Sequence, residues 1–163
     1  MKKFNFLVFI VLGLFFTACN SEVNTKPKEV KFDREVCERC KMIISDRNYA
    51  VQVVNPQDGK SYYHDDIGCA ILWFEESEIS WKNEAIIYVA DVNSGKWIDA
   101  KKAFWTFGAT TPMDFGFSAY ESKQDGENFE FTHVVQKVKE KINQITQDIW
   151  GINNEKSFSS FKN

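Results

Sequence analysis

The chain has 163 residues, of which 44% are hydrophobic and 26% are charged, and its formal net charge is −3. This length suits one domain of ordinary size, or two very small ones, and is sufficient to bury a hydrophobic core. The mildly acidic balance excludes a nucleic-acid binder that relies on phosphate contacts, because such a protein needs a basic face. Fifteen phenylalanines, five tryptophans and five tyrosines exclude an intrinsically disordered tail protein.

Residues 1–18 have the features of a secretory signal peptide rather than of a folded domain. Lys2 and Lys3 form a short basic segment, and an apolar run of eleven residues follows from Phe6 to Phe16. A membrane-spanning helix needs roughly 20 apolar residues. The shorter run seen here is typical of a signal peptide that is removed from the mature protein.

Small residues precede a cysteine at the end of this run. The sequence Phe16-Thr17-Ala18-Cys19 resembles a bacterial lipobox, in which cleavage precedes the cysteine and its sulfur then carries a lipid. An ordinary secretory signal that ends near a cysteine is the alternative. We expect a lipidated Cys19, a flexible tether over residues 19–31, and a protein anchored in the cell envelope that faces the periplasm or the exterior. Cleavage removes two lysines and no acid, so the mature chain has 18 basic and 23 acidic residues and a net charge of −5.

The first half of the mature chain predicts two strands, a helix and a third strand. Residues 49–54 are β-branched and partly alternating, and residues 61–64 return as a second strand after a turn that contains proline and glycine. Asp65 and Asp66 follow, and we interpret them as a helix cap or as support for neighbouring ligands. The apolar positions of the next segment have helical spacing: Ile67, Ala70, Ile71 and Phe74. Residues 85–90 form a buried strand, which gives the order ββαβ.

The second half predicts three short strands and one long helix. The strands cover residues 96–99, 103–107 and 117–120. Apolar residues recur at helical spacing over residues 132–150, with lysine, glutamate and glutamine between them, which predicts an amphipathic helix that faces the core. Residues 151–163 are polar, and we expect them to form a frayed tail.

Three cysteines remain once Cys19 is assigned to lipid. Cys37, Cys40 and Met42 follow the pattern C-x-x-C-x-M, in which two sulfurs separated by a turn can face one ion. Thiolates and a thioether are soft donors that together select Cu(I), whereas Zn²⁺ has little use for a thioether. Met113 lies in a second turn-rich segment and offers another soft donor. The pair of methionines therefore favours copper.

Each of these residues also has a structural interpretation. The C-x-x-C pair alone is compatible with a disulfide, and Met42 and Met113 could fill gaps in the core. Cys69 is expected to be a small buried hydrophobe. His64 is either an added ligand or a surface or capping histidine, and His133 is expected to be structural.

Three functions compete on this basis. A copper chaperone would use Cys37, Cys40, Met42, Met113 and His64 as metal ligands. A thiol–disulfide oxidoreductase would use the C-x-x-C pair, but such a motif should begin an amphipathic helix, and none follows here. A structural zinc module would combine the same pair with Cys69 and His64, a complete tetrahedral set. No nucleophile–base pair or phosphate-binding loop supports an enzyme.

Several motifs occur in an order that is specific in combination. They are Cys37–Met42 with Ile43 and Asp46, Asp65–Cys69, Tyr88–Asp91 with Trp97–Ala100, and Thr111–Met113 with Gly116. Together they resemble the NosL family, the copper-binding lipoproteins that accompany nitrous oxide reductase. The resemblance extends over about residues 36 to 122 of the chain.

The resemblance implies an α+β fold of two related ββαβ units, here about residues 32–92 and 93–150 of one domain. It also implies a protein without enzymatic activity that binds Cu(I) and helps to assemble the copper centres of the reductase. The implied partners are apo nitrous oxide reductase and an ABC-type membrane complex dedicated to its maturation.

By position, Cys37, Cys40 and Met42 match the first ligand motif of the family, and Met113 matches its T-P-M loop. Family members commonly have an aromatic residue before the Asp-Asp pair, where this chain has His64, which adds an imidazole donor. The family pattern ends near residue 120, so the prediction of the long helix rests on periodicity alone.

Overall fold

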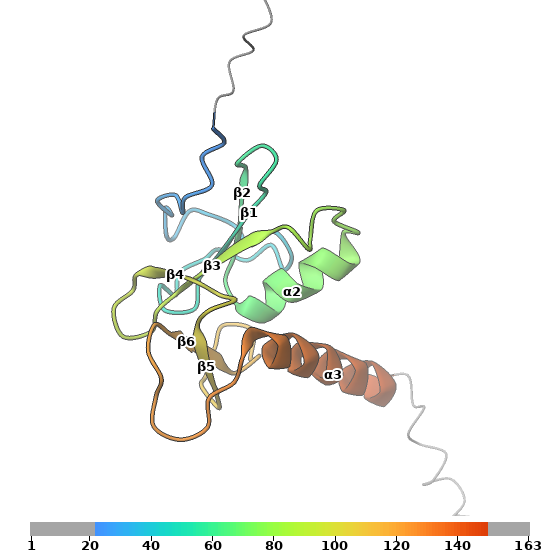
Figure 1. Cartoon of the computed structure of the whole chain (residues 1–163). Coiled ribbons are helices and arrows are strands. Elements are labelled where there is room, and N and C mark those ends of the chain that lie inside the picture. Colours follow the sequence, from blue (N-terminus) through green and yellow to red (C-terminus); the bar gives the residue numbers. More distant parts are fainter. Residues whose placement is uncertain (1–21, 150–163) are drawn as a thin grey trace, which may run out of the picture.

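The computed structural model describes residues 22–149, so the predicted signal peptide, Cys19 and the polar tail lie outside the described residues. Figure 1 shows the elements in chain order. They are β1 (Val51–Val54), β2 (Ser61–His64), α2 (Ile67–Glu76), β3 (Ile86–Ala90), β4 (Trp97–Asp99), β5 (Phe104–Phe107), β6 (Phe117–Tyr120) and α3 (Phe131–Ile149).

Four antiparallel strands form the first sheet, in the order β2-β1-β3-β4. Val51 of β1 lies opposite His64 of β2 and opposite Val89 of β3. All four residues of β1 are buried, as expected of a central strand that is covered on both faces. The hydrophobic residues of β1 join the core, whereas Gln52 is a buried polar residue that needs a partner.

An N-terminal segment supplies that partner. The Lys28 backbone N–H donates to Gln52 Oε1 at 2.7 Å, and Gln52 Nε2 donates to the Lys28 carbonyl at 3.0 Å. The Tyr88 hydroxyl donates to the Thr25 carbonyl at 3.3 Å, and Val30 is buried. Part of the segment in which we expected a flexible tether therefore contacts the first sheet.

The helix α2 begins at Ile67, where the apolar periodicity predicts it. The periodicity predicts one buried face, but every residue from Ile67 to Phe74 is buried. Figure 1 shows the reason, because α2 lies between the first sheet and α3. Within this layer, the Trp73 ring packs against the rings of Tyr62 and Trp81.

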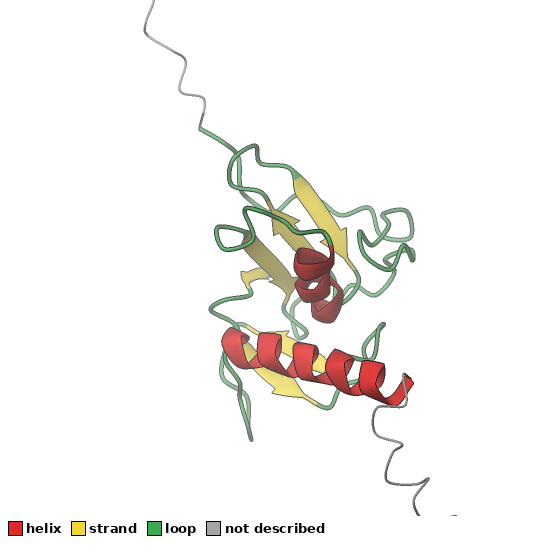
Figure 2. Ribbon diagram, turned by 90° about the vertical axis from the view of Figure 1, so that its right-hand side faces the viewer, coloured by secondary structure: helices red, strands yellow, loops and turns green. Residues whose placement is uncertain are grey.

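The strands β5 and β6 form a separate antiparallel pair, and Figure 2 shows α3 lying alongside it. The described helix ends one residue short of the predicted 132–150 pattern and begins one residue earlier. Val134 and Val138 are buried, but Ile145 and Ile149 are exposed, since α3 is nearly twice as long as α2, against which it packs. Neither helix in residues 22–149 has the length and apolar content needed to cross a bilayer.

The α+β class is confirmed, and β1, β2, α2 and β3 have the predicted ββαβ order. The strand β4, which we expected to open the second unit, pairs with β3 instead, with Ala90 opposite Trp97. A short turn joins these two strands, so antiparallel pairing is the local solution. The second unit then consists of β5, β6 and α3, with an isolated bridge between Trp105 and Phe129.

Candidate metal centre

Four side chains bring possible metal ligands together between the loop before β1 and the start of α2. The cysteine sulfurs and the carboxylate oxygen all lie within 4.8 Å of one another, and the residues are Cys37, Cys40, Asp65 and Cys69. Cys37, Asp65 and Cys69 are buried, and Cys40 is half-buried. We call these four residues the cysteine cluster.

Backbone hydrogen bonds give the C-x-x-C loop its shape. Val36 and Ile43 form an antiparallel bridge. Between them, Cys37 N donates to the Met42 carbonyl at 2.8 Å and Lys41 N donates to the Cys37 carbonyl at 3.1 Å. Lys41 has a φ of 63°, so one left-handed residue closes the turn. The tight turn places both cysteine sulfurs on the same side.

Two contacts attach this loop to the neighbouring elements. The Glu38 backbone N–H donates to the Tyr63 carbonyl of β2 at 2.9 Å. Arg39 forms a bidentate ion pair with Glu76 at the end of α2, with Nη2 2.8 Å from Oε1 and Nε 3.0 Å from each carboxylate oxygen. Bidentate geometry restricts orientation as well as distance. The loop is therefore attached to β2 on one side and to the C-terminal end of α2 on the other.

The start of α2 supplies the other half of the cysteine cluster. Asp66 is the N-cap, and its Oδ1 accepts from Gly68 N at 2.9 Å. Asp65 and Cys69 are four residues apart across this cap, a spacing that places them on one side of the first turn. The Cys40 thiol donates to Asp65 Oδ2 at 3.4 Å, which joins the two halves.

The pKa values of the three cysteine thiols are shifted in different directions. A hydrogen bond from the Cys69 thiol, helped by His64 and opposed by burial, lowers the pKa of Cys37. The pKa of Cys69 is raised because its thiol donates to Cys37 and is buried. Burial raises the pKa of Cys40 to about 11. Among the three cysteines, the thiolate form is therefore favoured most at Cys37 and least at Cys69.

Burial and the nearby Cys37 charge raise the pKa of Asp65 to about 6. Asp65 Oδ1 is buried and has no hydrogen-bond partner within residues 22–149. Most buried polar atoms have a partner, so an orphaned oxygen beside three sulfurs fits a site built to receive a cation. The donor set, three thiols and a carboxylate, fits a metal ion that accepts sulfur ligands.

His64 ends β2 beside the cluster and is fully buried. Its Nδ1 is 3.9 Å from Cys37 Sγ, and its ring packs 5.2 Å from the Trp73 ring, centroid to centroid. Burial lowers the pKa of His64. A neutral imidazole can bind a metal ion or form a hydrogen bond with a neighbouring group. In this structure, the His64 ring is a hydrogen-bond partner of Cys37.

The two methionines lie in different environments. Met113 packs against the hydrophobic cluster that contains Cys37 and Cys69. Met42 is 46% exposed, and its backbone carbonyl, not its sulfur, accepts a hydrogen bond from Cys37 N. The Met113 side chain therefore packs beside two of the cluster cysteines, Cys37 and Cys69, whereas Met42 lies at the surface.

Our sequence interpretation treated Cys69 as a packing residue and Asp65 as a capping or supporting residue. Cys69 is fully buried, as expected, but its sulfur also belongs to the cluster. The spacing of four residues from Asp65 to Cys69 was a usable signal, because it places both at one side of a helix start. His133 lies on α3, where its ring stacks on Phe129 at 4.6 Å between centroids.

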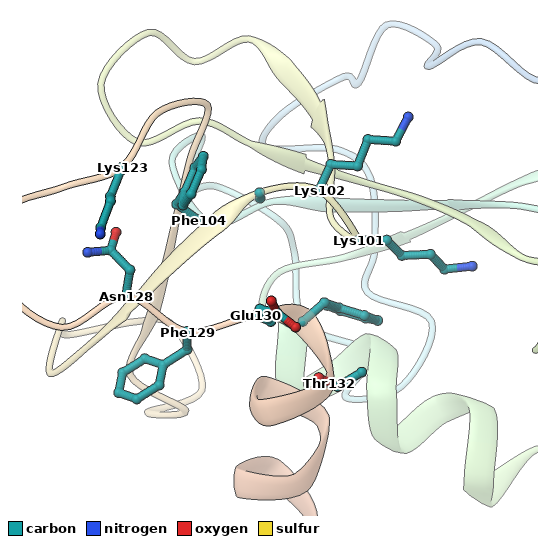
Figure 3. Close-up of a pocket in the computed structure, with 10 residues that line it drawn as sticks. Lys101, Lys102, Phe104, Lys123, Asn128, Phe129, Glu130 and Thr132 are labelled. Carbon is teal, nitrogen blue, oxygen red and sulfur yellow. The ribbon is translucent and has the colours of Figure 1, made fainter.

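A surface pocket of about 710 Å³ lies elsewhere, between β5 and the first turn of α3. Figure 3 shows Lys123 next to Asn128 on one side of it and Glu130 and Thr132 at the helix start. No cysteine or histidine lines this pocket. The cysteine cluster is therefore the better candidate for metal chemistry.

No protein-family model matches the sequence, and a search of the curated proteins finds no match. Among solved structures, the chain is similar to the copper chaperone NosL from Shewanella denitrificans, with a TM-score of 0.53 and 15% sequence identity. The similarity covers 66% of this chain and 94% of that one. The expected NosL-type architecture is thus confirmed at the level of the fold.

Proposed function

We propose that this protein is a Cu(I) chaperone that carries copper in the cysteine cluster and has no enzymatic activity. The observation that supports this proposal best is the gathering of three cysteine sulfurs at one site, with the Met113 side chain packed beside Cys37 and Cys69. Sulfur ligands of both kinds select Cu(I) over harder cations. A half-buried Cys40 leaves one edge of the site open to an acceptor protein.

In this proposal, Cys37, Cys40 and Cys69 are the thiolate ligands and Met113 is the thioether ligand. Cys37 is the cysteine whose thiolate is most favoured, because hydrogen bonds from Cys69 and His64 lower its pKa. Met42, on the exposed side of the same loop, is placed to exchange the ion with a partner. His64 supports Cys37 through its Nδ1, and it becomes a ligand only if the ring moves closer to the ion.

The acceptor in this proposal is apo nitrous oxide reductase, reached through an ABC-type membrane complex. The similarity of the fold to a copper chaperone named NosL supports this choice. Anchoring through a lipidated Cys19 would keep the protein in the cell envelope. To test this delivery, the copper-loaded protein is incubated with the apo-reductase, and the copper content of the reductase is measured afterwards.

A zinc site is the second candidate, and Asp65 favours it. Three thiolates and one carboxylate oxygen form a four-ligand set of the kind that Zn²⁺ takes in tetrahedral sites. The two candidates differ in their use of the methionine, because Zn²⁺ rarely binds a thioether. Replacement of Met113 should therefore leave Zn²⁺ affinity unchanged and weaken Cu(I) binding.

The first prediction follows from this ligand set. In an anaerobic competition titration against a chromogenic Cu(I) chelator, Cys37→Ser should weaken Cu(I) binding by more than about 100-fold. The double variant Met42→Leu with Met113→Leu should weaken it strongly while the fold is retained, because leucine conserves the volume and removes the sulfur. Met113→Leu alone should account for most of the loss.

X-ray absorption on the copper-loaded protein counts the sulfur donors directly, and circular dichroism checks the fold of each variant. Equal affinities of the wild type and the double methionine variant would contradict the assignment of a thioether ligand. Preference for Zn²⁺, with no measurable Cu(I) affinity, would overturn the copper proposal itself.

A further inference from the structure

The carboxylate of Asp66 does more than cap α2. Its Oδ1 accepts from Gly68 N, and this bond alone satisfies the role of an N-cap. Its Oδ2 accepts from the Thr111 hydroxyl at 2.5 Å and from Met113 N at 3.3 Å. Asp66 is 1% exposed, so these bonds form away from water. One buried carboxylate thus joins the start of α2 to the loop of residues 111–116.

Thr111 extends this hydrogen-bond network into its own loop. While its hydroxyl donates to Asp66, the same oxygen accepts from Gly116 N at 3.1 Å. The Thr111 carbonyl accepts from Asp114 N at 3.0 Å. A single hydroxyl therefore acts as donor and acceptor at once, a role that serine can reproduce and valine cannot.

Close packing holds the same loop against α2. The Phe115 ring lies over Gly68, and a Cβ added at Gly68 would come within 2.1 Å of that ring. From the other side, Lys141 of α3 donates to the Asp114 carbonyl and contacts its carboxylate at 3.0 Å. The loop is therefore fixed between the two helices by contacts that are independent of the cysteine cluster.

These contacts fix the backbone of Met113, whose side chain packs against the buried cluster that contains Cys37 and Cys69. Its backbone is held by Asp66, the residue between Asp65 of the cluster and the helix that carries Cys69. A thioether is a neutral and weak donor, so its contribution depends on being held in place rather than on charge. We infer that Asp66 and Thr111 are positioning residues that fix the Met113 thioether against the cysteine cluster for Cu(I). This inference rests on the proposed function.

The experiment uses the full chain with Thr111→Val, Thr111→Ser and Met113→Leu. Thr111→Val should weaken Cu(I) binding roughly 10- to 100-fold, in the range known for residues that orient metal ligands, and Thr111→Ser should retain the wild-type affinity. Combining Thr111→Val with Met113→Leu should add no further loss, because both remove the same interaction. Asp66→Asn, which keeps a capping oxygen, is the second variant if Thr111→Val does not fold.

A spectroscopic readout separates positioning from general support of the fold. In protein labelled at the methionine methyl groups, the Met113 signal, identified with Met113→Leu, should shift on addition of Cu(I). The shift should persist in Thr111→Ser and disappear in Thr111→Val and in Asp66→Asn.

A normal Met113 shift and affinity in Thr111→Val would overturn the positioning role and leave the proposed function intact. The positioning role would also be overturned if Thr111→Val weakened Cu(I) binding by the same factor in the Met113→Leu variant as in the wild type. The loop would then act on the other ligands. If the wild-type Met113 signal does not move and Met113→Leu binds normally, the thioether assignment fails together with the inference.

Discussion

At the scale of single residues, the candidate metal ligands of the cysteine cluster are also titratable groups with shifted pKa values. Hydrogen bonds from Cys69 and His64 lower the pKa of Cys37, whereas the pKa values of Cys40 and Cys69 are raised. A metal ion bound by all three sulfurs would replace the protons of Cys40 and Cys69. Metal binding and proton release are therefore coupled.

This coupling predicts that Cu(I) binding releases about two protons near neutral pH if Cys40 and Cys69 both become ligands. Since the pKa of Cys40 is raised to about 11, its thiol is protonated throughout the range in which the protein is handled. The affinity should rise as the pH rises, roughly tenfold per pH unit for each proton released. Competition titrations at several pH values measure this slope.

The variant Cys69→Ser is the matched control, because it should release one proton fewer and flatten the slope by the corresponding amount. A slope that Cys69→Ser leaves unchanged would show that Cys69 keeps its proton in the metal complex. The ligand set would then be limited to Cys37, Cys40 and Met113.

At the scale of elements, Asp91 joins the two sheets. It follows β3, and its Oδ1 accepts from the backbone and the hydroxyl of Ser94, at 2.7 Å each. Its Oδ2 accepts from Glu121 N, directly after β6, at 2.8 Å. Burial raises the pKa of Asp91, but the hydrogen bonds from Ser94 and Glu121 outweigh it and lower the pKa below its usual range. The connection therefore depends on an ionised carboxylate.

Asp91→Ala should lower the free energy of unfolding by about 2 kcal/mol at neutral pH, because it removes several hydrogen bonds to a buried charge. A lowered pKa in the folded state stabilises the protein above the unfolded pKa, and this contribution is lost as the pH falls through the folded value. The difference between wild type and variant should therefore shrink below about pH 4. Urea denaturation at several pH values measures it.

The exposed residue Asp125 provides the control, since Asp125→Ala should leave the free energy of unfolding nearly unchanged. A difference between wild type and Asp91→Ala that stays constant down to acidic pH would mean that the protonated side chain holds the sheets equally well.

At the scale of the whole molecule, the site is assembled from segments that are far apart in the chain. Cys37 and Cys40 precede β1, Asp65 and Cys69 lie at the start of α2, and Met113 lies between β5 and β6. The unfolded chain does not hold these groups together. Metal binding should therefore favour the folded state.

Anaerobic chemical denaturation should show that Cu(I) raises the free energy of unfolding, by about 2.7 kcal/mol when free Cu(I) is held near 100 times its dissociation constant. Residual binding by cysteines of the unfolded chain would reduce this value. A variant with Cys37→Ser and Cys40→Ser should show no such increase. Coincident unfolding curves of the wild type with and without Cu(I) would contradict a site that spans these segments.

Local signals were sufficient for much of the architecture. The turn residues between β1 and β2, the acidic cap at Asp66 and the apolar spacing of α2 and α3 depend on neighbours only a few residues away. The chemical class of the site was also readable, because C-x-x-C-x-M puts soft donors within one turn. The pairing of β4 with the first sheet could not be predicted from the sequence, since strand pairing depends on packing partners that no local pattern specifies.

By itself, the sequence determined which donors exist, where α2 begins and about where α3 lies, and that a soft metal was the best match. The tertiary structure alone decided which donors meet. Cys69 and Asp65 join Cys37 because α2 packs beside the loop before β1, and Met113 reaches them because Asp66 and Thr111 hold its loop. Met42 stays exposed although it is only two residues from Cys40. The physical reason is that chain distance limits where a side chain can be, but packing decides which way it faces.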